Sequence, residues 1–164
     1  MRGGKLLGGK GASIKTAVFR TVMELVVAVY NISSVPKMLE LAKITYGFGV
    51  RRLALVKVFG AAAQQIGDLF KLAFKMGGEV LVFNDINDAV EVLKPDVIYA
   101  IGRPDKDTKP VEKVDKKVML LIHGADLAFS PRELPPGAVL SHAVHRDIGS
   151  AGQLAVALYK LLET

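Results

Sequence analysis

The sequence contains no cysteine, which excludes a disulfide scaffold, a thiolate zinc site and a cysteine nucleophile. It also lacks a long hydrophobic run. The longest apolar stretch near the amino terminus, residues 25–30, is much shorter than the ~20 residues that cross a bilayer. A signal peptide is not indicated, because Glu24 interrupts this apolar region and no small-residue cleavage site follows it. These absences exclude a membrane-spanning protein, and we expect a cytoplasmic one.

Acidic residues are absent from residues 1–22, which carry five of the 22 lysines and arginines. The rest of the chain carries the remaining basic residues and all 16 acidic residues, so its net charge is close to zero. We interpret residues 1–22 as a basic, glycine-rich arm, either appended to the domain or the product of an upstream start, and residues 23–164 as the domain. Residues 4–11 approach the phosphate-binding P-loop pattern. No strand can precede them and Gly11 replaces the required hydroxyl, which argues against such a site.

From residue 23 on, short apolar runs alternate with longer segments of helical periodicity. This pattern is typical of βαβ units with a parallel sheet, and strands that are apolar throughout indicate helices on both faces. The length also fits one domain. We therefore predict a single α/β domain whose polar segment 103–116 is an exposed loop. The predicted strands are 25–30, 52–58, 79–83, 96–101, 117–122 and 139–144, and the predicted helices are 34–47, 61–76, 86–93 and 149–163.

Ligands of parallel α/β sheets bind beyond the carboxyl ends of the strands. Three predicted strands end in segments that combine glycine or other small residues with polar side chains, namely residues 99–103, 121–126 and 143–150. A glycine there lets a flat ligand approach the backbone closely. We expect these three segments to form a ligand site.

A metal site is an alternative use of the same segments. His142, His145 and Asp147 lie in one of them and His123 in another, and imidazole and carboxylate groups bind zinc or manganese. On a strand, however, His142 and His145 would point to opposite faces, and the segment offers no helical i, i+4 pair. We therefore predict no metal.

Three segments resemble the motifs of one enzyme family. Residues 31–56, NISSVPKMLELAKITYGFGVRRLALV, are similar to a helix that ends in Phe-Gly-Val and leads into a strand. Residues 120–133, LLIHGADLAFSPRE, are similar to a glycine-containing loop, and residues 148–162, IGSAGQLAVALYKLL, to a serine-containing segment before a helix. Together they resemble the SPOUT superfamily of RNA methyltransferases, on its SpoU-like (TrmH-like) side, over residues 24–163.

The resemblance implies an α/β domain with a C-terminal trefoil knot. It also implies an S-adenosylmethionine-dependent methyltransferase that acts on tRNA or rRNA as a homodimer. Methylation of a ribose 2′-hydroxyl and methylation of a base both stay open.

The site residues implied by the resemblance fall into three groups. Main-chain groups of the three strand-end segments would hold S-adenosylmethionine, at Ile101, Gly102, Ile122, His123, Gly124, Ala143, Val144, Ile148 and Gly149. Catalysis is assigned to Lys43, Asp126 and Ser150, and RNA binding to Lys37, Arg51, Arg52, His145 and Arg146. Lys43 stands where the family has arginine and Asp126 where it has glutamate. Gly152 stands where the family has asparagine if Ser150 is matched to the family's serine.

These departures keep a second hypothesis open, a non-catalytic protein that retains the fold and binds cofactor or RNA. A third hypothesis is an unrelated α/β enzyme that acts on a small molecule. Binding of S-adenosylmethionine separates the third hypothesis from the other two. Methyl transfer to RNA separates the first from the second.

Overall fold

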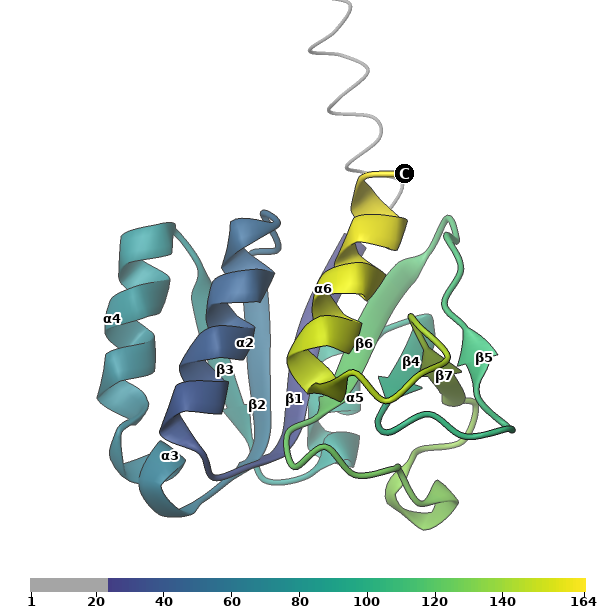
Figure 1. Cartoon of the computed structure of the whole chain (residues 1–164). Coiled ribbons are helices and arrows are strands. Elements are labelled where there is room, and N and C mark those ends of the chain that lie inside the picture. Colours follow the sequence, from purple (N-terminus) through teal and green to yellow (C-terminus); the bar gives the residue numbers. More distant parts are fainter. Residues whose placement is uncertain (1–23) are drawn as a thin grey trace, which may run out of the picture.

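Seven parallel strands form one sheet in the computed structural model of the protein, which describes residues 24–164 (Figure 1). Their spatial order is β3-β2-β1-β6-β4-β7-β5, and all neighbours pair in parallel. The strands are β1 (Glu24–Ile32), β2 (Arg52–Val58), β3 (Glu79–Phe83), β4 (Val97–Ile101), β5 (Lys109–Pro110), β6 (Lys117–His123) and β7 (Val139–His142). The predicted single α/β domain is confirmed. The predicted arm, residues 1–22, lies outside the described residues.

Helices cover both faces of the sheet (Figure 1). One face carries α2 (Val35–Gly47), α4 (Ile66–Met76) and α6 (Gly149–Leu162), with the short α3 (Gly60–Gln64) leading into α4. The other face carries α5 (Ile86–Leu93), which buries Ile86, Ala89 and Leu93 against the sheet. Coverage of both faces explains why the central strands β1, β4 and β6 are apolar and buried along most of their length.

Local sequence signals set several helix ends. The Ser34 hydroxyl accepts a hydrogen bond from the Lys37 amide and caps α2, and the Asp85 carboxylate caps α5 in the same way. After α4 the chain reverses at Gly77, whose φ of 75° is left-handed and suits glycine. These caps explain why the predicted starts of both helices agree with the structure to within one residue.

Three elements differ from prediction. The predicted helix 61–76 is two helices, because Gln65 (φ −103°, ψ 19°) closes α3 before α4 begins. The predicted strand 139–144 ends at His142 as β7, and the chain then turns. The predicted loop 103–116 contains the short strand β5, which pairs with β7 at the sheet edge.

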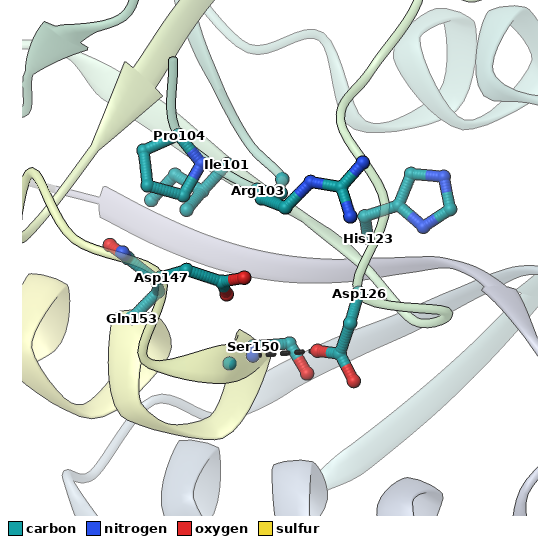
Figure 2. Close-up of a pocket in the computed structure, with 10 residues that line it drawn as sticks. Ile101, Arg103, Pro104, His123, Asp126, Asp147, Ser150 and Gln153 are labelled. Carbon is teal, nitrogen blue, oxygen red and sulfur yellow. Dashed lines mark hydrogen bonds between the residues drawn. The ribbon is translucent and has the colours of Figure 1, made fainter.

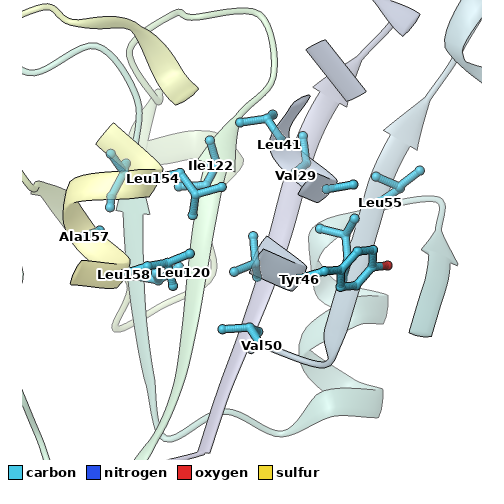
Figure 3. Packing of buried hydrophobic residues seen from close by; sticks show 14 of the residues in the cluster. Val29, Leu41, Tyr46, Val50, Leu55, Leu120, Ile122, Leu154, Ala157 and Leu158 are labelled. Atoms are coloured by element: carbon cyan, nitrogen blue, oxygen red, sulfur yellow. The ribbon is translucent and has the colours of Figure 1, made fainter. Parts of the chain in front are cut away.

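The larger core lies between the sheet and the helices α2, α4 and α6 (Figure 3). Leu120 and Ile122 of β6 face Leu154 and Leu158 of α6, and all four side chains are fully buried. Each such side chain stabilises the fold by about 1.5–3 kcal/mol through removal of apolar surface from water. This packing holds the amino end of α6 against the carboxyl end of β6.

No helix within residues 24–164 is long and apolar enough to span a membrane. The trefoil knot implied by the resemblance stays a prediction.

Candidate functional site

A small pocket lies at the carboxyl edge of the sheet, where the loops after β4, β6 and β7 meet (Figure 2). We call it the Asp126 pocket. Its volume is about 10 Å³, which is room for about one water molecule. It is lined by Ile101, Gly102, Arg103, Pro104, His123, Asp126, Asp147, Gly149, Ser150 and Gln153. The three strand-end segments therefore meet as predicted.

Asp126 joins two distant parts of the chain at this pocket. Its carboxylate accepts a hydrogen bond from the Ser150 amide at the first turn of α6, with an N–O distance of 2.7 Å (Figure 2), and forms an ion pair with the Lys37 ammonium of α2. Burial alone raises the pKa of Asp126, but the hydrogen bonds from Lys37 and Ser150 outweigh it and hold the pKa below its ordinary value. Asp126 is therefore ionised at neutral pH. Its backbone is left-handed (φ 59°), which is uncommon for a residue other than glycine.

His123 ends β6 with its side chain almost fully buried. The ring packs against Tyr30 and Phe129, with centroid distances of 5.5 and 4.9 Å. Burial lowers the pKa of His123, and its Nδ1 accepts a hydrogen bond from the Ala125 amide at 3.2 Å. We infer that the ring is neutral and carries its proton on Nε2, so it offers the pocket a donor rather than a base.

Gln153 holds the loop between β7 and α6. Its Oε1 accepts hydrogen bonds from the amides of Ala143 and Val144, and its Nε2 donates to the carbonyls of Val144 and Arg146. The side chain is 2% exposed, so these bonds form out of water. The neighbouring Ser150 Oγ is buried and is the one side-chain polar atom of its kind in the described residues without a hydrogen-bond partner.

The structure brings six of the predicted site residues into the pocket lining: Ile101, Gly102, His123, Asp126, Gly149 and Ser150. Ile122, Gly124, Ala143, Val144 and Ile148 belong to the same loops and do not line it. Gly124 instead packs on β1, since a Cβ there would lie 2.8 Å from the Asn31 carbonyl oxygen.

Other predicted residues lie apart from the pocket. Lys43 is exposed on α2 and makes none of the contacts that Lys37 makes. Arg51 and Arg52 precede or begin β2, at the opposite edge of the sheet, and both pair with Glu79. Strand direction separates them from the pocket, because all strands of a parallel sheet begin on one side of the sheet and end on the opposite side, where the pocket lies.

Four pocket residues were assigned no role in the predicted site, namely Arg103, Pro104, Asp147 and Gln153, although Arg103 and Asp147 lie within two of the predicted strand-end segments. Arg103, Pro104 and Asp147 follow strand ends, so a stricter use of the strand-end rule could have selected them. Gln153 carried no sequence signal, because its role depends on how α6 approaches β7. Lys37 was assigned to RNA, whereas its ammonium contacts Asp126.

The histidines form a different arrangement from the predicted one. His142 and His145 do not point to opposite faces, because β7 ends at His142, and their rings stack with centroids 4.6 Å apart. His142 Nδ1 lies 2.8 Å from Thr108 Oγ1, and His145 Nε2 lies 2.7 Å from the Asp105 carbonyl oxygen. Within residues 24–164, no three histidine, aspartate or glutamate side chains gather closely enough to hold a metal ion.

Comparison with known proteins identifies relatives of two kinds. A sequence model of the family described as "RecB-family nuclease (DUF2122)" matches residues 60–160. The chain is also similar to MjaORF1200P of Methanocaldococcus jannaschii, whose name assigns it to the type II restriction enzymes. Their identity is 32% over 138 residues, covering 82% of this chain and 94% of that relative.

Several solved structures with a similar fold carry names that describe them as methyltransferases. One, from Bordetella pertussis Tohama I, has a TM-score of 0.62 at 13% identity and covers 87% of this chain and 96% of its own. The SpoU methyltransferase AviRb from Streptomyces viridochromogenes has a TM-score of 0.57 at 13% identity, over 84% of this chain and 58% of its own. The resemblance to the SPOUT superfamily is thus confirmed for the fold, and identity this low shows the fold alone.

The predicted activity is wrong on these findings. The family description and the restriction-enzyme name of the relative contradict an S-adenosylmethionine-dependent RNA methyltransferase, and with it S-adenosylmethionine as the cofactor. The motif resemblance reflected the shared fold, and a shared fold does not imply a shared activity.

Proposed function

This chain belongs to the RecB-family nuclease (DUF2122) family, and from that premise we propose that it binds DNA at the carboxyl edge of its sheet and cleaves it. DNA is the substrate class to which the name of the restriction-enzyme relative points. Cleavage of DNA breaks a phosphodiester bond, so the site must first hold a polyanionic backbone. The carboxyl edge offers suitable cations.

The observation that carries the proposal is a row of exposed cations along this edge. Lys57 is the penultimate residue of β2, and Arg103 and Arg146 lie in the loops after β4 and β7. None of the three forms an ion pair within the described residues. Three strand spacings separate β2 from β4 and one separates β4 from β7, so the row spans about 20 Å at ~4.8 Å per strand. One DNA strand carries a phosphate about every 3.4 Å, and the row can therefore contact several phosphates at once.

The side chains around the Asp126 pocket suit a phosphodiester in part. Arg103 supplies a planar cation that binds phosphate by two hydrogen bonds, whereas the charge of Lys37 is already paired with Asp126. Many nucleases hold divalent metal ions with clustered carboxylates. Asp126 and Asp147 both line the pocket, but no third ligand joins them within residues 24–164, so a preformed metal centre does not fit these residues.

The test is a paired binding and cleavage assay on the purified full chain. Fluorescence anisotropy with labelled duplex DNA, single-stranded DNA and RNA measures affinity at several salt concentrations. Gel analysis of the same DNAs, with Mg²⁺ or Mn²⁺ and with a chelator, measures cleavage. Tight, salt-dependent binding to DNA together with cleavage is the expected result. Absence of DNA binding would overturn the proposal.

A second candidate function is DNA binding without cleavage. It is favoured by one specific observation, the lack of a three-ligand carboxylate or histidine group among the described residues. Binding with no cleavage under any metal condition would support this candidate over the first. Homodimerisation and a cytoplasmic location, both expected from the sequence, stay predictions.

A further inference from the structure

A second groove lies at the same carboxyl edge, at the ends of β1, β2 and β3, and shares no lining residue with the Asp126 pocket. We call it the Phe59 groove. Its volume is about 460 Å³, within the range of sites that hold small organic groups. The lining residues relevant here are Asn31, Lys57, Phe59, Val82, Phe83 and Asn84.

The backbone beside the groove is distorted at two facing positions. Asn31 and Lys57 lie opposite each other, between the register pairs Tyr30–Val56 and Ile32–Val58. Both are left-handed, with φ of 64° and 61°. Non-glycine residues rarely adopt this conformation, and such distortions cluster at ligand sites. The paired distortion interrupts the regular alternation of side chains at the ends of both strands, and both side chains line the groove.

Apolar surface is exposed in this groove. Phe59, directly after β2, is 50% exposed, and Val82 of β3 is 48% exposed. An aromatic ring with an open face is the platform on which a nucleobase stacks, and stacking accepts any base. Phe59 can therefore bind a base by its flat face.

Two carboxamides complete the polar side of the groove. Asn31 and Asn84 form no side-chain hydrogen bond within residues 24–164. Each carboxamide offers both a donor and an acceptor, which is the combination that reads the edge of a base. They are free to bond to a ligand.

Lys57 adds a charge at the rim. Its ammonium lies 5.9 Å from the centroid of the Tyr30 ring and is exposed, with no carboxylate partner in the described part of the chain. A phosphate attached to a bound nucleotide would be attracted to this cation. The groove thus combines a stacking ring, two carboxamides and one positive charge.

We propose that the Phe59 groove binds one unpaired nucleobase of a DNA strand, stacked on Phe59 and hydrogen-bonded at its edge by Asn31 and Asn84. The base must be single-stranded or turned out of the duplex, because a base within a duplex exposes no face to a protein ring. This inference rests on the proposed function, since Lys57 belongs to the same row of cations. It adds that the protein prefers unpaired bases.

The test compares two labelled single strands, oligodeoxythymidylate and the same strand with abasic sites. Anisotropy should show about tenfold or tighter binding of the strand with bases. Phe59→Ala should abolish this difference and leave the affinity for the abasic strand unchanged. The matched control is Phe74→Ala, which removes a phenylalanine that is 90% exposed on α4 and lies outside the groove. It should behave as wild type.

Two results would overturn the proposal. One is equal binding of both strands by the wild type, and the other is an equal loss for both strands in Phe59→Ala. Thermal melting of each variant checks that the fold is kept. A strand containing 2-aminopurine provides a second readout, because stacking on Phe59 quenches its fluorescence and Phe59→Ala should restore the signal.

Failure of the proposed function is distinguishable from failure of this inference. If the wild type binds neither strand, the proposed DNA-binding function is rejected. Titration with thymidine monophosphate then tests the groove alone. Saturable binding that Phe59→Ala removes would identify a free-nucleotide site. No binding of the mononucleotide would reject the groove as well.

Discussion

Lys37 and Asp126, 89 residues apart in the chain, form an ion pair that joins the first turn of α2 to the loop after β6. The same carboxylate accepts the Ser150 amide, so it also ties this loop to the amino end of α6. Three segments that are distant in sequence therefore meet at one side chain. Asp126 itself lines the Asp126 pocket, together with Arg103.

The first prediction concerns the charge of Asp126. Asp126→Asn removes the ion pair while keeping a residue that tolerates a left-handed backbone. The pKa of Asp126 is lowered in the folded state, so its stabilising effect is present above the unfolded value near 3.8 and is lost as pH falls through the folded pKa. We expect the variant to be less stable than the wild type by about 1 kcal/mol of unfolding free energy at pH 7. The two proteins should be equally stable at a pH below the folded-state pKa of Asp126.

Urea denaturation across this pH range measures the effect. Asp147→Asn is the control, because Asp147 lines the same pocket and is exposed without an ion pair in the described residues. A pH-independent loss in Asp126→Asn would show that shape rather than charge matters at this position.

The second prediction concerns Gln153. Gln153→Ala leaves the buried amide of Ala143 and the half-buried amide of Val144 without their acceptor and frees the loop before α6. Each unsatisfied buried group costs about 1–3 kcal/mol, so we expect a loss of about 3 kcal/mol in unfolding free energy. Chemical denaturation measures it, with the exposed Gln64→Ala as the control. A loss similar to that of the control would contradict the assigned role.

The third prediction concerns alkaline stability and Tyr46. Burial, followed by the nearby Glu79 charge, raises the pKa of Tyr46 to about 12. Since the folded pKa exceeds the unfolded value of 10.0, this stabilisation is complete below pH 10 and is lost as pH rises toward the folded pKa. Tyr46→Phe removes the group that titrates, so the unfolding free energy of the variant should decrease less as the pH rises. At pH 7 the variant should lose about 1 kcal/mol, because the hydroxyl donates to the Glu79 carbonyl.

Denaturation of both proteins from about neutral pH, at which tyrosine is protonated, to strongly alkaline pH tests this prediction. Tyr30 and Tyr99, whose pKa values are also raised, remain in both proteins and cancel in the comparison. Parallel pH curves for wild type and variant would contradict the prediction.

The fourth prediction tests the row of cations. If Arg103 contacts a DNA phosphate, Arg103→Gln should weaken binding to all duplex sequences alike and reduce the slope of log affinity against log salt by about 0.9. The control is Lys75→Gln, which removes a charge from the last turn of α4 near the starts of the strands. Anisotropy at several salt concentrations measures both slopes. An unchanged slope in Arg103→Gln would show that Arg103 does not contact a DNA phosphate.

Much of the fold could be predicted because its signals are local. The start and end of β2 and β3 agree with the predicted ranges, since these strands are short apolar runs bounded by turn residues. The break at Gln65 could not be predicted, because residues 61–76 keep one helical periodicity across it. The stacking of His142 and His145 also depended on where β7 stops pairing with its neighbours.

The sequence by itself determined the α/β class, the parallel sheet and the edge at which the loops meet, because apolar periodicity and strand direction follow from the chain alone. Only the tertiary structure decided which side chains share that edge. It paired Lys37 with Asp126, separated Arg51 and Arg52 from the pocket, and left the Phe59 groove open. The physical reason is that ion pairs and cavities depend on packing between segments far apart in sequence, and periodicity carries no information about that packing.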